Sequence, residues 1–274
     1  MVERKILDHR LLVEKLIEDK LNHRAHGNRI GASALAAPCD RQIWYQWRWV
    51  KQPEGISAQL KRLFNRGNQE EPVVYAELEE AGVIIIATQE HMTFINGFCG
   101  GIHDGIITKV PDAPKTDHLL EIKTANQKNF DLIRRNKVRK AKPDHFTQMQ
   151  VYMHLWKLKR ALYVCTNKNT DERYYERVPY DKNAAAQAMA RAAKIVTSES
   201  PPPRVANTLD DWPCKWCAFK EICHHGAKIK KTCRSCEHMD LHDDGVWHCS
   251  KKGKDRSKKA QEKGCKQWLR LPGL

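Results

Sequence analysis

The sequence predicts a mixed α/β (α+β) fold, in which helices flank a central mixed sheet and a small cysteine-rich module follows at the C-terminal end. Three observations support this. Helical and β-rich patterns alternate through the first 200 residues, a proline run at 201–203 ends the last helical pattern, and seven of the ten cysteines come after it. A chain of 274 residues is long enough for one sizeable core and an appendage. We therefore expect a core over 1–206, a cysteine knuckle over 207–226 and a basic module over 227–274.

The first third is predicted to be helical, because apolar residues recur at helical spacing in 6–22, 33–50 and 57–81. Short β-rich runs from 82 to 109, separated by turn signals such as Asn96-Gly97, predict consecutive antiparallel strands. The remaining predicted elements alternate: a strand at 118–124, helices at 126–137 and 144–158, strands at 161–165 and 172–179, and an alanine-rich helix at 181–197.

A formal net charge of +15 favours a polyanionic partner, with nucleic acid ahead of an anionic membrane surface. The excess of positive charge is strong from Gly226 onward, where the sequence has 13 Lys and Arg residues and 6 Asp and Glu residues. No run approaches the roughly 20 apolar residues that cross a bilayer, and the charged start does not resemble a signal peptide. We therefore expect a cytoplasmic protein that binds no membrane.

Glu-x-Lys occurs three times, but only Glu121 and Lys123 lie in an apolar strand pattern, where a period of two places both on one face. Asp104 stands in another glycine-rich strand pattern that could pair beside them. Two neighbouring carboxylates repel each other unless a cation offsets their charge, and oxygen ligands suit Mg²⁺ or Mn²⁺. The alternative is a surface pair at Glu121 and Lys123 with Asp104 in a turn.

Several motifs together resemble RecB-like nucleases of the PD-(D/E)xK superfamily. They are Gly101-Ile-His-Asp104, Glu121-Ile-Lys123, Gln148-Met-Gln-Val-Tyr152 and Arg66-Gly-Asn-Gln-Glu-Glu71. The resemblance implies a restriction-endonuclease-like core, in which Lys123 orients or activates water and Gln148 and Tyr152 contact substrate and support the site. It also implies the metal ligands, which would be Asp104, Glu121, the Ile122 carbonyl and Glu71, with Glu70 as the rival of Glu71. His103 stands where the superfamily name expects proline.

A first cysteine set is Cys214, Cys217 and Cys223, whose spacing allows the three thiolates to face one metal centre. Cys39 resembles the N-terminal cysteine of RecB-like nucleases that carry a [4Fe–4S] cluster, such as CRISPR adaptation nucleases. The resemblance therefore implies an iron–sulfur cluster that joins both ends of the core. A zinc site completed by His224 or His225, with Cys39 as a buried thiol, is the alternative.

A second cysteine set predicts a tetrahedral Zn²⁺ site, because a tail of fewer than fifty residues cannot bury much core. Its members are Cys233, Cys236, Cys249 and Cys265. Three histidines remain possible substitutes: His238, His242 and His248. The alternative is a disordered basic tail. Cys99 and Cys165, on predicted strands, are expected in the core.

A basic segment directly after the Glu-x-Lys strand is expected to hold DNA phosphates, with a solvated loop as the alternative. Its residues are Arg134, Arg135, Lys137, Arg139 and Lys140. Aromatic residues between Arg41 and Trp49 could stack on unpaired bases, although packing around the cysteine cluster is the favoured role.

Together these features predict a Mg²⁺- or Mn²⁺-dependent deoxyribonuclease acting in recombination, repair or phage DNA metabolism. Cleavage from DNA ends is implied only by resemblance to recombination exonucleases, so an endonuclease remains open, as do strand and polarity. The alternatives are a non-catalytic DNA-binding or scaffold protein and a redox-responsive regulator. A recombinase, a single-strand-binding protein or a helicase are possible partners, and an oligomer is possible.

Overall fold

A five-stranded mixed sheet lies at the centre of the computed structural model, which describes residues 9–21 and 25–274. Its strand order is β2-β5-β6-β7-β8. The strands are β2 (Ile84–Thr88), β5 (Gly105–Thr108), β6 (His118–Ala125), β7 (Arg160–Asn167) and β8 (Arg173–Pro179). Only β6 and β7 pair in parallel, joined by a helical crossover; the other pairs are antiparallel. The predicted mixed α/β class is confirmed.

Helices cover both faces of this sheet. The helices are α3 (Ala58–Glu80), α4 (Gln127–Ala141) and α5 (Pro143–Trp156), and α6 (Lys182–Thr197) packs on the outside of α5. On one face, Val74 and Leu78 of α3 pack with Leu120 and Ile122 of β6. On the other, Leu119 belongs to a larger cluster that includes side chains of α4 and α5. Burial on both faces explains why β6 is apolar in sequence apart from a few polar positions.

The predicted meander over 82–109 is only partly right. Strand β2 pairs with β5, but the intervening hairpin of β3 (His91–Phe94) and β4 (Cys99–Ile102) forms a second sheet with β1 (Ile30–Gly31). The run predicted as one strand over 101–108 breaks at His103-Asp104 between β4 and β5. Asp104 therefore lies at the junction of two sheets, where its side chain is not fixed by strand alternation.

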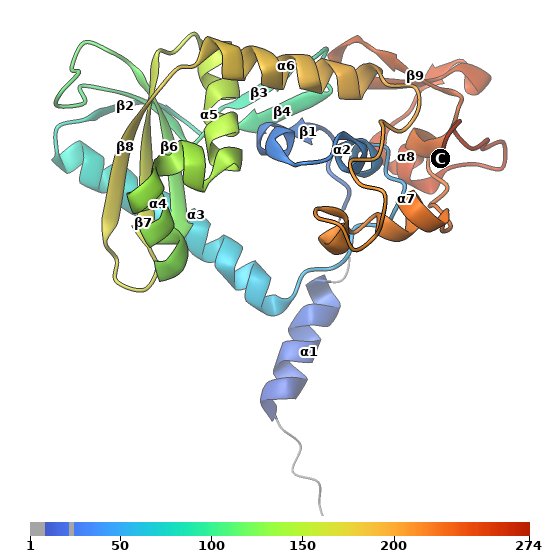
Figure 1. Ribbon diagram of the computed structural model, residues 1–274, viewed down its shortest axis with the longest axis horizontal. Helices are drawn as coiled ribbons and strands as arrows, with labels where there is room; N and C mark the ends of the chain where they lie inside the picture. Colours follow the sequence, from blue (N-terminus) through green and yellow to red (C-terminus); the bar gives the residue numbers. More distant parts are fainter. Residues whose placement is uncertain (1–8, 22–24) are drawn as a thin grey trace, which may run out of the picture.

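The N-terminal helices differ in part from the prediction. The segment 33–50 divides into a 3-10 helix, Ala32–Ala36, and α2, Asp40–Trp47, because Pro38 holds the residue before it in an extended conformation. Helix α1, His9–Leu21, stands away from the body (Figure 1), and the remaining residues of the predicted 6–22 helix lie outside the described residues. No helix in the described ranges combines the length and apolar character needed to span a membrane.

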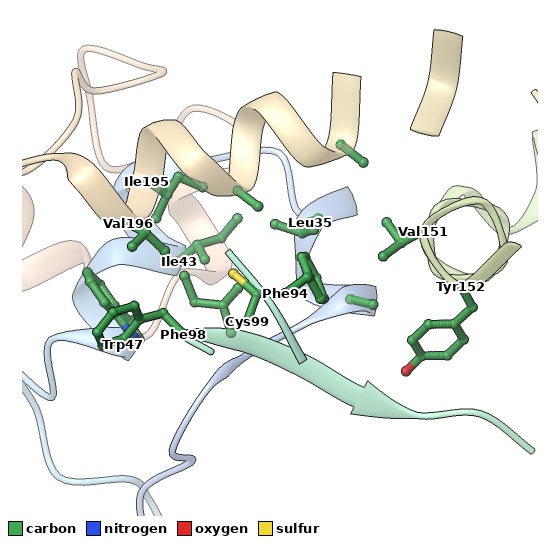
Figure 2. Packing of buried hydrophobic residues seen from close by; sticks show 14 of the residues in the cluster. Leu35, Ile43, Trp47, Phe94, Phe98, Cys99, Val151, Tyr152, Ile195 and Val196 are labelled. Atoms are coloured by element: carbon green, nitrogen blue, oxygen red, sulfur yellow. The ribbon is translucent and has the colours of Figure 1, made fainter. Parts of the chain in front are cut away.

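The C-terminal segment packs against the N-terminal one at the end of the molecule opposite the five-stranded sheet (Figure 1). It holds α7 (Lys220–His225), α8 (Lys258–Lys263) and a three-stranded sheet of β9 (Met239–His242), β10 (Val246–Cys249) and β11 (Lys254–Asp255). The segment is thus a folded unit with its own sheet and not the disordered tail of the alternative. Figure 2 shows Trp47 beside Phe98 in the shared core, and Trp247 packs edge-on against Phe98.

Two buried arginines hold these ends together. Arg234, 1% exposed, lies between the rings of Trp49 and Trp247 and donates hydrogen bonds to Asn28 and Gln261. Arg48 stacks over Trp44, Trp47 and Trp247. The rings of the aromatic segment are 0–3% exposed, so they pack in the core, as the favoured interpretation expected, and the alternative of base stacking is wrong. They are Trp44, Tyr45, Trp47 and Trp49.

Candidate active site

Asp104, Glu121 and Lys123 meet on one side of β6, as the sequence predicted. The Ile122 N–H donates a 2.6 Å hydrogen bond to Asp104 Oδ2, which fixes the β4–β5 junction against β6. The Lys123 ammonium pairs with Glu121, lies 3.7 Å from Asp104 Oδ2 and donates a 3.1 Å hydrogen bond to the Ile122 carbonyl. The alternative of an exposed surface pair is wrong, because the Glu121 side chain is fully buried.

Burial gives Glu121 unusual electrostatics. Apart from the Lys123 ammonium, the described residues offer no hydrogen-bond donor to its two carboxylate oxygens. Burial raises the pKa of Glu121 to about 7, and the Asp104 charge adds to this while Lys123 opposes it. Burial disfavours the charged Lys123, yet Glu121 and Asp104 raise its pKa overall. A buried carboxylate with unfilled oxygen lone pairs, next to a second carboxylate and a backbone carbonyl, is a donor set that fits Mg²⁺ or Mn²⁺.

Glu71 rather than Glu70 faces this group. Burial and the Asp104 charge raise the pKa of Glu71, and Lys123 opposes the rise. Gln89 donates a 2.6 Å hydrogen bond to Glu71 Oε2. Glu70 points elsewhere, because it pairs with Arg173 and accepts a hydrogen bond from Thr166. The geometry therefore favours Glu71 as the third carboxylate.

Tyr152 reaches the site from α5. Burial and the charges of Glu121 and Asp104 raise its pKa. Figure 2 shows its ring directed from α5 toward β4, where a Cβ on Gly101 would collide with the Tyr152 hydroxyl. Gln148 lies one turn earlier on α5 and is half-buried. The glycine in the Gly101 motif thus leaves room for the tyrosine of the later motif.

Tyr75 is a site residue that the sequence reasoning missed. Its hydroxyl donates a 2.6 Å hydrogen bond to the backbone carbonyl of Asp104. The signal was available, because Tyr75 lies four residues after Glu71 on α3 and so shares its face. His103, by contrast, is 1% exposed and packs edge-on against Trp156, with Glu90 3.7 Å away.

The predicted DNA-contacting residues lie along the exposed side of α4, and several are already engaged. Arg134 pairs with Asp131 and Glu172, Arg139 pairs with Asp181, and Arg135 donates to the Asp131 carbonyl. Lys137 has a positive φ of 61° and interrupts the helix. Lys137 and Lys140 are exposed. The segment is therefore a kinked helix and not a solvated loop.

The first cysteine set comes together from both ends of the core. Cys39, Cys214, Cys217 and Cys223 line one pocket beside α2 and α7. The Arg41 guanidinium bridges the two segments, because it contacts Cys223 Sγ at 3.9 Å and donates to the carbonyls of Pro201 and Pro202.

In the second set, the Cys236 N–H donates to the Cys233 carbonyl in a tight turn, as the Cys217 N–H does to Cys214. Cys249 and Cys265 lie close enough to Cys233 to raise its pKa, after burial, the largest cause. In the described part of the chain, the group whose ligand atoms all lie within 4.8 Å of one another is His242, His248 and Asp255, on adjacent strands. Four thiolates on one zinc would lie about 3.8 Å apart, so neither cysteine set has zinc-binding spacing in this structure.

Comparison with known proteins gives one family match. The model of the YqaJ-like viral recombinase domain matches residues 21–167, which contain all four motifs of the candidate site. No curated protein matches the chain.

Solved structures similar to the chain include two exonucleases. An alkaline exonuclease, LHK-Exo from Laribacter hongkongensis, is 20% identical, with a TM-score of 0.44 over 66% of this chain and 90% of that chain. A phage-related exonuclease from Haemophilus somnus 129PT is 18% identical, with a TM-score of 0.38 over 59% and 80%. The protein SSO0001 is 21% identical, with a TM-score of 0.41 over 79% and 96%. At these TM-scores the family match is the informative comparison.

Proposed function

Because the chain belongs to the YqaJ-like viral recombinase domain family, we propose that it is a divalent-metal-dependent exonuclease that hydrolyses DNA in recombination or phage DNA metabolism. The family match agrees with the resemblance of its motifs to PD-(D/E)xK nucleases. The observation that carries the proposal is the fully buried Glu121 carboxylate beside Asp104 and Lys123.

In the proposed hydrolysis of phosphodiesters, the residues of the site bind the metal ion, orient water and position the phosphate. Asp104, Glu121, Glu71 and the Ile122 carbonyl would hold Mg²⁺ or Mn²⁺, which when bound supplies charge stabilisation at the scissile phosphate. The Lys123 ammonium lies among these oxygens, so it can orient a water molecule and offset charge that develops during attack. Tyr152 borders the same space from α5, where it can position the phosphate, and Gln148, one turn earlier on that helix, can assist it. Tyr75 holds the Asp104 backbone in place.

End-labelled linear DNA and closed circular DNA test the proposal. Wild-type protein and Asp104→Asn are compared with Mg²⁺, with Mn²⁺ and with EDTA. We expect nucleotide release from linear DNA that EDTA and the substitution abolish, while the circle stays intact. Cleavage of the circle would indicate an endonuclease. DNA binding without cleavage under every metal would overturn the proposal in favour of a non-catalytic DNA-binding protein.

We also propose that the first cysteine set holds a [4Fe–4S] cluster as a structural element. Support comes from the four thiols that line one pocket although Cys39 is 175 residues from Cys214 in sequence. Anaerobically purified protein should then contain about four irons and absorb near 400 nm, and Cys39→Ser should lose both features. Stoichiometric zinc without iron would support the alternative site instead.

The second cysteine set remains a candidate zinc site. The tight turn at Cys233–Cys236 supports it, whereas the spacing of the thiols does not. Metal analysis of Cys236→Ser separates it from the first set, because a zinc ion bound there would be lost while any iron is retained.

A further inference from the structure

A pocket of about 150 Å³ lies directly beyond the catalytic lysine on the same side of β6. Its polar lining comes from the end of β6, the start of α4, the start of α5 and the turn after β7. These polar residues are Thr124, Asn126, Asn129, Lys142, His145 and Lys168. None of the residues that line it is acidic. The volume equals that of a few water molecules, at about 30 Å³ each, and so suits a small anion.

The backbone around this pocket is firmly tied. The Lys168 N–H donates a 2.8 Å hydrogen bond to the Ala125 carbonyl, and the Gln127 N–H donates to Asn169 Oδ1 at 3.0 Å. The Asn167 side chain donates to Gln127 Oε1 at 2.7 Å. The turn after β7 is therefore fixed against the end of β6, and it presents Lys168 to the pocket without a large loss of conformational freedom on binding.

Two of the side chains that line the pocket, Lys142 and Lys168, carry a positive charge. Lys142 donates a 3.3 Å hydrogen bond to the neutral Asn129 side chain. Within the described ranges, neither the Lys142 nor the Lys168 ammonium forms an ion pair with a carboxylate. Burial lowers the pKa of His145 to about 4; among the nearby charges, Asp144 raises this pKa, and Lys123 and Lys142 lower it. Two ammonium groups that line one pocket are an arrangement that binds phosphate oxygens.

The pocket lies about one phosphate spacing away from Lys123 along β6. The pocket lining includes Cys165, which pairs with Lys123 across the parallel strands, and Ala125, which lies two residues beyond Lys123 on the same face of β6. Two strand residues span about 6.6 Å. That separation is comparable to the step between neighbouring phosphates on one DNA strand.

We propose that this pocket, through Lys142 and Lys168, binds a non-scissile phosphate of the DNA strand that is being cut. The inference rests on the proposed nuclease function and deepens it, because it fixes the register of the strand relative to Lys123. The phosphate could be a terminal monoester or an internal diester, which offer the same oxygens to the two ammonium groups.

Binding to fluorescently labelled DNA in EDTA tests the pocket without any cleavage. Lys142→Gln and Lys168→Gln are compared with wild type and with Lys194→Gln, which removes an exposed charge on α6. We expect affinity to fall about 10-fold for each pocket variant, as for loss of one charged hydrogen bond. The slope of log K against log salt should shrink by about 0.7 to 0.9. The Lys194→Gln variant should change neither the affinity nor the slope, and Lys142→Arg, which keeps the positive charge, should have wild-type values of both.

Chemically altered DNA identifies which phosphate is bound. Wild type and Lys168→Gln are compared on DNA with a phosphate or a hydroxyl at its ends, and on DNA with one uncharged methylphosphonate linkage at successive positions. If the two proteins bind hydroxyl-ended DNA with equal affinity, the pocket holds a terminal phosphate. If their affinities become equal only when one particular linkage is uncharged, the pocket holds that internal phosphate. A difference that persists on every substrate, or an unchanged salt slope in correctly folded variants, overturns the pocket proposal. Failure of wild type to cleave DNA would instead reject the nuclease function, which these binding measurements do not require.

Discussion

The Ile122 amide and the Asp104 carboxylate form a 2.6 Å hydrogen bond across two sheets. One carboxylate oxygen of Asp104 is thereby used for structure, and the charge of the group remains available to a cation. The bond also places the Ile122 carbonyl and Glu121 within the same small space as Asp104.

Asp104→Asn should separate these two contributions. The asparagine side-chain oxygen can still accept the Ile122 N–H, so the melting temperature should stay close to that of wild type. Loss of the negative charge should lower nuclease activity roughly 100- to 1000-fold, the scale seen when one electrostatic contact to a transition state is removed. Nucleotide release and thermal melting measure the two effects. Asp117→Asn, at an exposed position, is the control and should change neither.

Glu121 predicts a pH dependence of stability in metal-free protein. Its pKa rises on folding from an ordinary value near 4.5 to about 7. The folded state therefore holds the proton more tightly, and the corresponding stability is full below pH 4.5 and lost as pH rises toward 7. Thermal melting in EDTA should show wild type losing stability across this window relative to Glu121→Gln. Addition of Mg²⁺ should stabilise wild type more at pH 8 than at pH 5, because the ion binds the ionised carboxylate. Parallel pH profiles for the two proteins would contradict this.

The contact between Gly101 and Tyr152 predicts a steric effect on stability. Gly101→Ala should destabilise the protein by about 1–3 kcal/mol, as overpacking commonly does, because the new methyl group meets the Tyr152 hydroxyl. Adding Tyr152→Phe should recover part of this loss, since the hydroxyl is the nearest atom. Chemical denaturation measures both variants.

Gly67→Ala is the matched control for that steric effect. Gly67 lies inside α3 with no atom within 4 Å of its added Cβ, so the change should stabilise the protein by about 0.5–1 kcal/mol. A loss of stability at Gly67 similar to that at Gly101 would show that the steric argument is wrong.

Replacing the buried Arg234 should lower the stability of the protein strongly. Arg234→Ala removes a stacked guanidinium between Trp49 and Trp247 and leaves Asn28 and Gln261 without their donor. We expect a loss of about 3–5 kcal/mol, typical of removing one member of a buried charged network. Limited proteolysis should then cut the region after Ile229 faster than in wild type. The exposed Lys266→Ala should leave both stability and proteolysis unchanged.

The sequence predicted the elements that have strong periodicity and the site residues that lie on them. Strand β6 illustrates this, because an apolar run with Glu121 and Lys123 two apart defines both the strand and its functional face. The strand pairing between β2 and β5 could not be predicted in the same way. Local alternation shows that 91–102 is extended, but it does not show which strand it pairs with, and the break at His103-Asp104 follows from the geometry of two separate sheets.

The C-terminal region shows a second limit. Cysteine spacing drew attention to metal binding, whereas Arg234 and Trp247 carry a large part of the packing there. Local patterns do not indicate that Arg234 will be buried, since two of its partners, Asn28 and Trp49, lie about 200 residues away in sequence. The burial of Trp44, Trp47 and Trp49 has the same origin.

The joining of both ends through Arg41 and Arg234 has a consequence for the order in which the chain can fold. During synthesis, residues 25–50 emerge before residues 215–274, which bring Arg234 and Trp247, two of the groups that cover the aromatic side chains of this segment. Contacts so distant in sequence carry a high cost of loop closure and form late. The five-stranded sheet, complete by residue 179, can therefore assemble while the tryptophan-rich segment is still partly exposed, and the nascent chain is most prone to aggregation before residues 215–274 are made.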